Sequence, residues 1–383
     1  MQTDKRIFML DIVRATAISL VLICHFSAFW IKDDFATHRA YATARSLFGV
    51  FGVEIFFVLS GFLIGGILIK RPPASFSDMK QFWIRRWLRT LPPYYLVMFA
   101  LALIFGFGWK TICRYGFFVQ WIDVPITPPV FFGVSWSLAI EEWAYILLPF
   151  VLYKATSENN IIYRVIFYLC ILTALRYSII IFRDYNTLGL NGFEPARILT
   201  YIRIDSIIWG VLAVSLKDKF LPKAGYYAAI GLCGFIAILI LLVVFPKVID
   251  HQWFLTIGQS LVGALVGMIL PYAYVNRMEV FAQNKLGRCI SFISAISYPL
   301  YLIHFEFVSM LLVKNNGSRL ISLLFTVCAL YFSIMFSWLM HKHIENPCMA
   351  FRDRLFPHIA RNVNNGVAIE SLTIEKQSPI VYF

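Results

Sequence analysis

An arginine and a histidine lie within the first long apolar stretch of the chain, residues 7–31, where charged side chains are costly. Arg14 and His25 are eleven residues apart, which places them on one helix face about 16 Å apart along the axis. Asp11 lies near the same face, three residues before Arg14. Insertion scales put an arginine at the centre of a membrane helix at about 2.5 to 3.5 kcal/mol. The pattern therefore predicts a polar cavity inside a helix bundle, used for chemistry or transport.

A second polar cluster is the arginine-rich segment FWIRRWLRTLPPYY, which precedes another apolar run. Arg86 and Arg89 are three residues apart and share a helix face, while Arg85 is adjacent in sequence. Two neighbouring guanidinium groups suit phosphate or pyrophosphate, which they can bind bidentately. The alternative is membrane anchoring by positive charges on the cytoplasmic side. Pro92 and Pro93 are expected to distort the start of the following span.

A pair of adjacent glutamates, Glu141 and Glu142, lies inside the apolar segment SWSLAIEEWAYILLP. Adjacent helix positions point in different directions, so at most one of them shares a face with a given partner. An intramembrane carboxylate is functional or paired by default. One glutamate could form a structural pair with a buried arginine. Alternatively, it could orient His25 and stabilise the cationic form of the imidazole.

Three further ionisable residues lie in later apolar runs. Arg203 and Asp205 are two positions apart in RIDSIIWG, so each is expected to find its partner on another span. Structural pairing and substrate contact both remain open for these two. His304, in ISYPLYLIHF, is either structural or part of the wall of a site.

The composition is that of a polytopic membrane protein. Hydrophobic residues make up 60% of the 383 residues, charged residues only 14%, and mean hydropathy is +0.72. Soluble domains carry about 25% charged residues. The net charge of +13 falls mainly in short loops between apolar runs. Membrane orientation and anionic lipids account for it, and nucleic acid is not an expected partner.

Ten apolar stretches predict an all-α bundle of about ten transmembrane helices. Roughly twice as many Lys and Arg residues fall on one side as on the other, which favours cytoplasmic N- and C-termini. Residues 1–345 are expected to form the membrane domain and 346–383 a cytoplasmic, partly disordered tail. The stretches are Ile7–Ile31, Leu47–Ile69, Pro93–Trp109, Ser135–Tyr153, Ile161–Phe182, Tyr201–Leu216, Gly225–Phe245, Phe254–Val275, Ile290–Val313 and Leu320–Met340.

Several smaller patterns complete this interpretation. Gly61, Gly65 and Gly66 form a small-residue pattern, for which close helix packing is expected. The seven cysteines contain no CxxC pair and predict neither a disulfide frame nor a metal site. Walker, Rossmann, HExxH and G-x-S-x-G motifs do not occur. The predicted tail is too short for a soluble catalytic domain, so the chemistry is expected within the membrane bundle.

In order along nearly the whole chain, the motifs resemble the acyltransferase-3 family of integral-membrane O-acyltransferases. The shared pieces are LDIVRATAISLVLICHF, FFVLSGFLIGG, RRWLR with PPYY, SWSLAIEEWAYILLP, RIDSIIWG, ISYPLYLIH and IENP. The resemblance implies a multi-pass protein of the cell (inner or plasma) membrane. It also implies transfer of an acetyl group from cytoplasmic acetyl-CoA to a hydroxyl of a cell-surface carbohydrate or small molecule.

The resemblance also assigns roles to residues. Arg14 and His25 would be the essential first-helix pair, Arg86 and Arg89 fill the R-x-x-R positions of the family, and Glu141 fills the acidic position. The resulting hypothesis has Arg86 and Arg89 hold the CoA phosphates, with Arg14 deeper along the same path. It makes His25 the general base, or else an acyl carrier, and has Glu141 hold its imidazole. Arg203, Asp205 and His304 are candidate acceptor contacts. No metal is expected, and the alternative function is a transporter or flippase for a polar or lipid-linked solute.

Overall fold

The computed structural model describes residues 7–29, 39–120, 131–182, 200–312 and 318–356, and within these the chain is helical with no β-strand. Each of the ten apolar stretches corresponds to a helix. These are α1 (Phe8–Phe26), α2 (Arg39–Lys70), α3 (Phe76–Phe105), α5 (Ser135–Val151), α6 (Glu158–Phe182), α8 (Thr200–Ser215), α10 (Ala224–Val244), α11 (Gln259–Val275), α13 (Lys285–Leu312) and α14 (Arg319–Met340).

Eight of the helical segments in the described part are long and apolar enough to cross a membrane, against the ten expected. The two that fall short are α5, with 17 residues, and α8, with 16. A spanning helix needs about 20 residues. Both short helices pack against several neighbours, with α8 contacting α2, α5, α6 and α11. They are therefore interior helices of the same bundle, and the chain is a multi-pass, all-α membrane protein.

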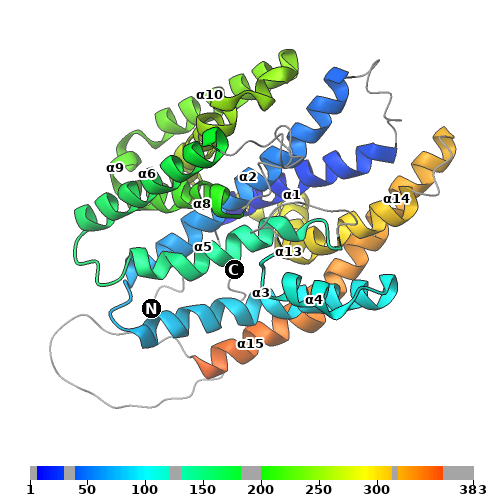
Figure 1. Cartoon of the computed structure of the whole chain (residues 1–383), viewed down its shortest axis with the longest axis horizontal. Helices are drawn as coiled ribbons and strands as arrows, with labels where there is room; N and C mark the ends of the chain where they lie inside the picture. The colour runs from blue at the N-terminus through cyan, green and yellow to red at the C-terminus, as the bar shows by residue number, and fades with distance from the viewer. Residues whose placement is uncertain (1–6, 30–38, 121–130, 183–199, 313–317, 357–383) are drawn as a thin grey trace.

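The helix α2 lies at the centre of the bundle, between α1 on one side and α8 and α11 on the other (Figure 1). α13 packs against α1 and α14, while α3 lies with the short helices α4 (Trp109–Gly116) and α15 (Asn346–Leu355) along one edge. Outward-facing positions on peripheral helices are apolar, such as Phe167 on α6, Ile240 on α10 and Leu324 on α14. Such a surface suits contact with lipid.

The close contact between α2 and α8 depends on glycine at Gly61 and Gly210. A Cβ atom at Gly61 would overlap the carbonyl oxygen of Ile207, and one at Gly210 would overlap that of Val58. The two helix backbones therefore approach closely, as expected for small residues in membrane helices. This crossing brings the middle of α8 against the middle of α2 and confirms the close packing expected of the glycine pattern.

Replacing Gly61 with alanine should destabilise the bundle, because the new methyl group would collide with backbone that cannot rotate away. Overpacking typically costs about 1 to 3 kcal/mol. Gly66→Ala is the matched control on the same helix, since a Cβ there would meet Val214 Cγ2 at an ordinary 3.5 Å. Thermal unfolding of the purified variants in one detergent measures the difference. Equal melting temperatures for the two variants would contradict the close approach.

The helix α3 begins earlier than the sequence indicated. Ser75 and Asp78 form a reciprocal capping box, so the helix starts at Phe76 and continues through Pro92 and Pro93. The arginine cluster is therefore inside the helix, about 2.5 to 3.6 turns from its start. The prolines lie in mid-helix, whereas they were expected at the start of a span.

The segment after α14 continues as helix across the expected domain boundary at residue 345. A single π-helical turn, His341–Glu345, leads into α15, which packs against α3. Arg85 donates to the Phe356 carbonyl oxygen and lies 3.4 Å from an Asp353 oxygen, so it faces α15. Residues 346–355 are thus joined to the bundle. The rest of the expected disordered tail, 357–383, lies outside the described residues.

Candidate functional site

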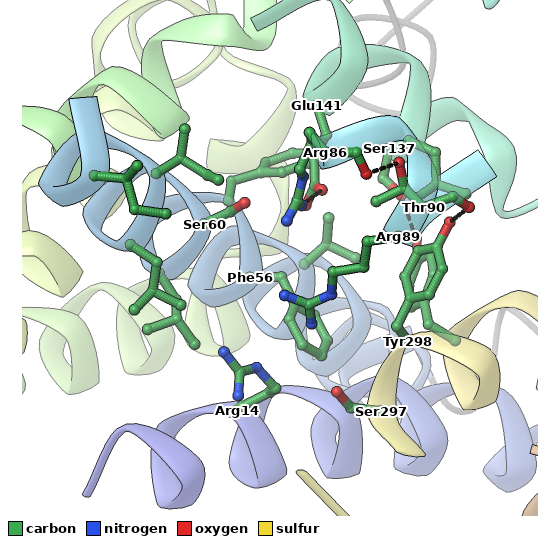
Figure 2. A pocket seen from close by; sticks show the side chains of 18 residues that line it. Arg14, Phe56, Ser60, Arg86, Arg89, Thr90, Ser137, Glu141, Ser297 and Tyr298 are labelled. Atoms are coloured by element: carbon green, nitrogen blue, oxygen red, sulfur yellow. Dashed lines mark hydrogen bonds and ion pairs between the residues drawn. The ribbon is translucent and has the colours of Figure 1, made fainter. Parts of the chain in front are cut away.

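Three arginines from two helices converge on a cavity of about 110 Å³ between α1, α2, α3, α5 and α13. Figure 2 shows Arg14 on α1 and both Arg86 and Arg89 on α3 extending toward the same space. The i,i+3 spacing places the two α3 arginines on one face, which confirms that expectation. Guanidinium groups gathered in this way are of the chemical type that binds phosphate or carboxylate groups.

Each of the three guanidinium groups has a carboxylate nearby. These carboxylates keep the arginines oriented and limit the cost of placing cations in the bundle. Glu345 comes from the π-helical turn, so the C-terminal segment contributes to the site. The nitrogen–oxygen distances are 3.6 Å for Arg14 and Asp11, 3.7 Å for Arg86 and Glu141, and 3.5 Å for Arg89 and Glu345.

Tyr145 links Arg86 to Glu141. An Nη2–H of Arg86 donates to the tyrosine hydroxyl at 2.8 Å, and this hydroxyl donates to Oε2 of Glu141 at 2.7 Å. The guanidinium carbon also lies 4.4 Å from the tyrosine ring centre, at cation–π distance. Glu141 therefore positions an arginine.

Glu141 was expected to hold the imidazole of His25. The structure instead places it beside Tyr145 and Arg86. Glu141 lines the same cavity as Arg14, whereas His25 does not line it and lies about three helical turns beyond Arg14, a rise of about 16 Å along α1. The adjacent Glu142 points elsewhere. It accepts hydrogen bonds from Trp87 Nε1 and Thr90 Oγ1 at 3.1 and 3.0 Å, as expected of a buried structural carboxylate.

His25 meets His304 on α13. Its Nδ1 lies 3.0 Å from Nε2 of His304, which is fully buried. About three turns nearer the start of α1, Arg14 donates to Ser294 Oγ at 3.3 Å, and Ser294 also lies on α13. Arg14 and His25 thus face the same neighbouring helix, as the eleven-residue spacing indicated.

His304 was a candidate acceptor contact, but both of its ring nitrogens are already engaged. Nδ1 lies 3.0 and 2.9 Å from the carbonyl oxygens of Leu300 and Tyr301, and Nε2 is used by His25. A fully buried ring whose two nitrogens both have hydrogen-bond partners has no nitrogen left to bind a substrate. The structure therefore assigns His304 to the histidine pair.

Tyr301 lies between the cavity and the histidine pair. Its hydroxyl is 2.8 Å from Ser137 Oγ, both residues line the cavity, and its ring centre is 5.8 Å from that of His304. Tyr301 thus lies beside both sites, with the arginines at one level of α1 and α13 and the histidines at another.

Arg203 and Asp205 belong to a separate buried cluster. Arg203 pairs with Glu54 on α2, and Asp205 pairs with Arg176 on α6. Gln259 on α11 accepts from Arg203 at 2.7 Å. Each residue thus finds its partner on another helix, as expected. The geometry supports structural pairing, the first of the two roles left open, because all four ionic side chains are at most 3% exposed.

A second cavity of about 600 Å³ adjoins the first. Arg14, Leu63 and Ile67 line both cavities. The larger one is bordered by residues near the ends of α2, α6, α8 and α11, including Lys70 and Arg277. The charge distribution predicts that this end of the bundle faces the cytoplasm. No group of three or more His, Cys, Asp or Glu side chains suited to a metal ion occurs among the residues that the structure describes.

Comparison with known proteins finds one family model that covers most of the chain and relatives that are named as O-acetyltransferases. The acyltransferase-3 family model, described as an acyltransferase domain, matches residues 8–342. The peptidoglycan O-acetyltransferase OatA of Listeria monocytogenes is 26% identical over 336 residues, covering 79% of this chain and 49% of that protein. A putative O-acetyltransferase of Staphylococcus aureus strain COL is 25% identical over 371 residues, covering 88% and 56%. The chain spans about half the length of these relatives. No solved structure matches.

Proposed function

Because the chain belongs to the acyltransferase-3 family and is an acyltransferase, we propose that it transfers an acetyl group from acetyl-CoA to a hydroxyl group of a cell-surface carbohydrate. The names of the relatives support acetyl as the group and an oxygen as its acceptor. One relative is named for peptidoglycan, which makes a cell-wall glycan the first acceptor to try. The membrane would then be the one that faces the cell wall.

The observation that carries this proposal is the convergence of Arg14, Arg86 and Arg89 on one cavity. Three cations there suit the phosphate groups of CoA. The adjoining 600 Å³ cavity supports donor access from the predicted cytoplasmic end, because it shares Arg14 with the smaller one. The anion site and His25 are separated by about three helical turns. A donor with a long arm between its phosphates and its thioester fits such a separation.

His25 is the group best placed to act as general base at the outer level. It is close to the C-terminal end of α1, and the charge distribution predicts that this end faces the outside. In the proposed step, the imidazole takes the proton of the acceptor hydroxyl while the oxygen attacks the thioester carbonyl. The tetrahedral intermediate collapses, its C–S bond breaks, and the CoA thiolate takes the proton back from the imidazolium. The products are an O-acetyl ester and CoA thiol.

An acyl-histidine intermediate is the competing route to the same products. In it the imidazole would attack the thioester, the thiolate would leave, and the hydroxyl would then attack the N-acyl group. Rapid quenching with labelled acetyl-CoA and no acceptor separates the two, since only the second route leaves label on the protein.

Arg89→Ala tests the phosphate role. Its loss should raise the KM for acetyl-CoA about 10- to 100-fold, because a hydrogen bond to a charged group contributes about 1.5 to 3 kcal/mol. Steady-state release of CoA thiol by the purified protein measures this. Arg85→Ala is the matched control, since Arg85 faces Phe356 and Asp353 on the α15 side. An unchanged KM for Arg89→Ala, or an equal rise in both variants, would remove the cavity arginines from the donor site.

A further inference from the structure

The hydrogen bonds around His304 determine where its proton lies. Nδ1 lies within 3.0 Å of two backbone carbonyl oxygens, from Leu300 and Tyr301. Carbonyl oxygens only accept, so Nδ1 must carry the hydrogen. A neutral imidazole has a single N–H group, and a neutral ring suits a site that is fully buried among uncharged partners. The Nε2 of His304 is therefore an acceptor.

The same reasoning extends to His25. Its Nδ1 lies 3.0 Å from the accepting Nε2 of His304, so this Nδ1 must donate. The neutral His25 ring then carries its proton on Nδ1 and its lone pair on Nε2. We propose that His304 is a positioning residue, which fixes the tautomer and the orientation of His25 so that Nε2 is the basic atom. The inference rests on the proposed role of His25 as general base.

The packing around the pair supports a fixed orientation. The ring of Phe305 meets His25 edge-on, with centres 5.0 Å apart and an angle of 73°. Phe305 is itself confined, since a Cβ at Gly133 would lie 2.9 Å from its Cε1. His25 is thus held by a hydrogen bond from one side and an aromatic edge from another. Restricting a base in this way reduces the entropy lost when the transition state forms.

A neutral imidazole is a suitable partner at this depth. A buried carboxylate in the same place would carry a large desolvation cost while His25 is neutral. His304 orients His25 with no added charge. When Nε2 of His25 takes up the hydroxyl proton, Nδ1–H still donates to His304, and that bond becomes charge-assisted and therefore stronger. The stabilisation thus grows as the charge develops, which is what catalysis requires.

The experiment compares His304→Gln with His304→Leu in the full chain, purified in nanodiscs. A glutamine oxygen can accept from Nδ1 of His25, whereas leucine fills similar space without an acceptor. His304→Leu should lower kcat for thiol release about 10²-fold, and His304→Gln should keep at least about a tenth of the wild-type kcat. The KM for acetyl-CoA should stay unchanged in both. If His304 had only a structural role, kcat would fall equally in both variants, in proportion to the fall in their melting temperatures. That result would contradict the inference.

Nitrogen-15 NMR of labelled histidine gives a readout independent of activity. The chain has seven histidines, so the His25 signals can be assigned by their loss in His25→Ala. The wild-type spectrum should show the hydrogen of His25 on Nδ1, and His304→Leu should release this preference. A hydrogen on Nε2 in the wild type, or an unchanged tautomer in His304→Leu, would overturn the inference. If the spectra agree but His25→Ala stays active, the proposed function fails instead.

Discussion

Replacing His25 with alanine should lower acyl transfer by about 10² to 10⁴-fold or more, the contribution typical of a general base. The imidazole takes the hydroxyl proton in the proposed step, and alanine leaves nothing in its place. Thiol release from acetyl-CoA, measured with the purified protein and an acceptor glycan, reports the loss. Insertion and folding should persist, because His25 is only partly buried.

Cys24→Ala is the control for this prediction. Cys24 is the adjacent residue near the same end of α1, but a neighbouring helix position points in a different direction. This variant should retain activity close to that of the wild type. Normal transfer by His25→Ala would exclude both the general-base route and the acyl-histidine route. A loss in Cys24→Ala as large as that in His25→Ala would instead indicate damage to the helix end.

The second large effect is expected from Arg176→Met. Removing this cation leaves the carboxylate of Asp205 buried without its compensating charge, and breaking a buried pair typically costs about 3 to 5 kcal/mol. The melting temperature in detergent should fall markedly. Adding Asp205→Asn to the same chain should recover part of the loss, since the uncompensated charge is then gone.

An exposed ion pair provides the comparison. Lys219 and Glu158 are 3.9 Å apart, and both side chains are more than half exposed. Lys219→Met should therefore change stability by less than about 1 kcal/mol. If Arg176→Met were as mild as Lys219→Met, the buried cluster would not be holding α6 to α8.

The sequence predicts features that depend on a single helix and its period. Arg14 and His25 face one neighbour because their spacing is close to three turns, and Arg86 and Arg89 share a face for the same reason. The glycine contact was likewise predictable from the small-residue spacing around Gly61, although Ile207 as its partner was not. The direction in which a side chain leaves its helix axis depends on its position in that helix alone, so residue spacing determines which side chains share a face.

The sequence does not predict which side chain meets which across the bundle. Glu141 and His304 were both available to His25, and the choice depends on how far along their helices α5 and α13 place them. Arg176 is visible in the sequence as an intramembrane cation, but its pairing with Asp205 follows only from helix packing. Glu54 was missed, although a lone carboxylate in FGVEIFF is itself a signal of a buried partner.

The most direct test of acyl transfer follows both halves of the donor in one experiment. The purified chain in nanodiscs is given acetyl-CoA labelled in the acetyl group, with and without cell-wall glycan fragments. Free thiol and label on the glycan are then measured together. The account predicts one thiol released for each label that appears as a base-labile ester, and at least about 10²-fold slower release from His25→Ala. If acetyl-CoA stays intact in the presence of folded wild-type protein, the account is contradicted. Transport of the unmodified glycan across a proteoliposome membrane by the same protein would then indicate a transporter.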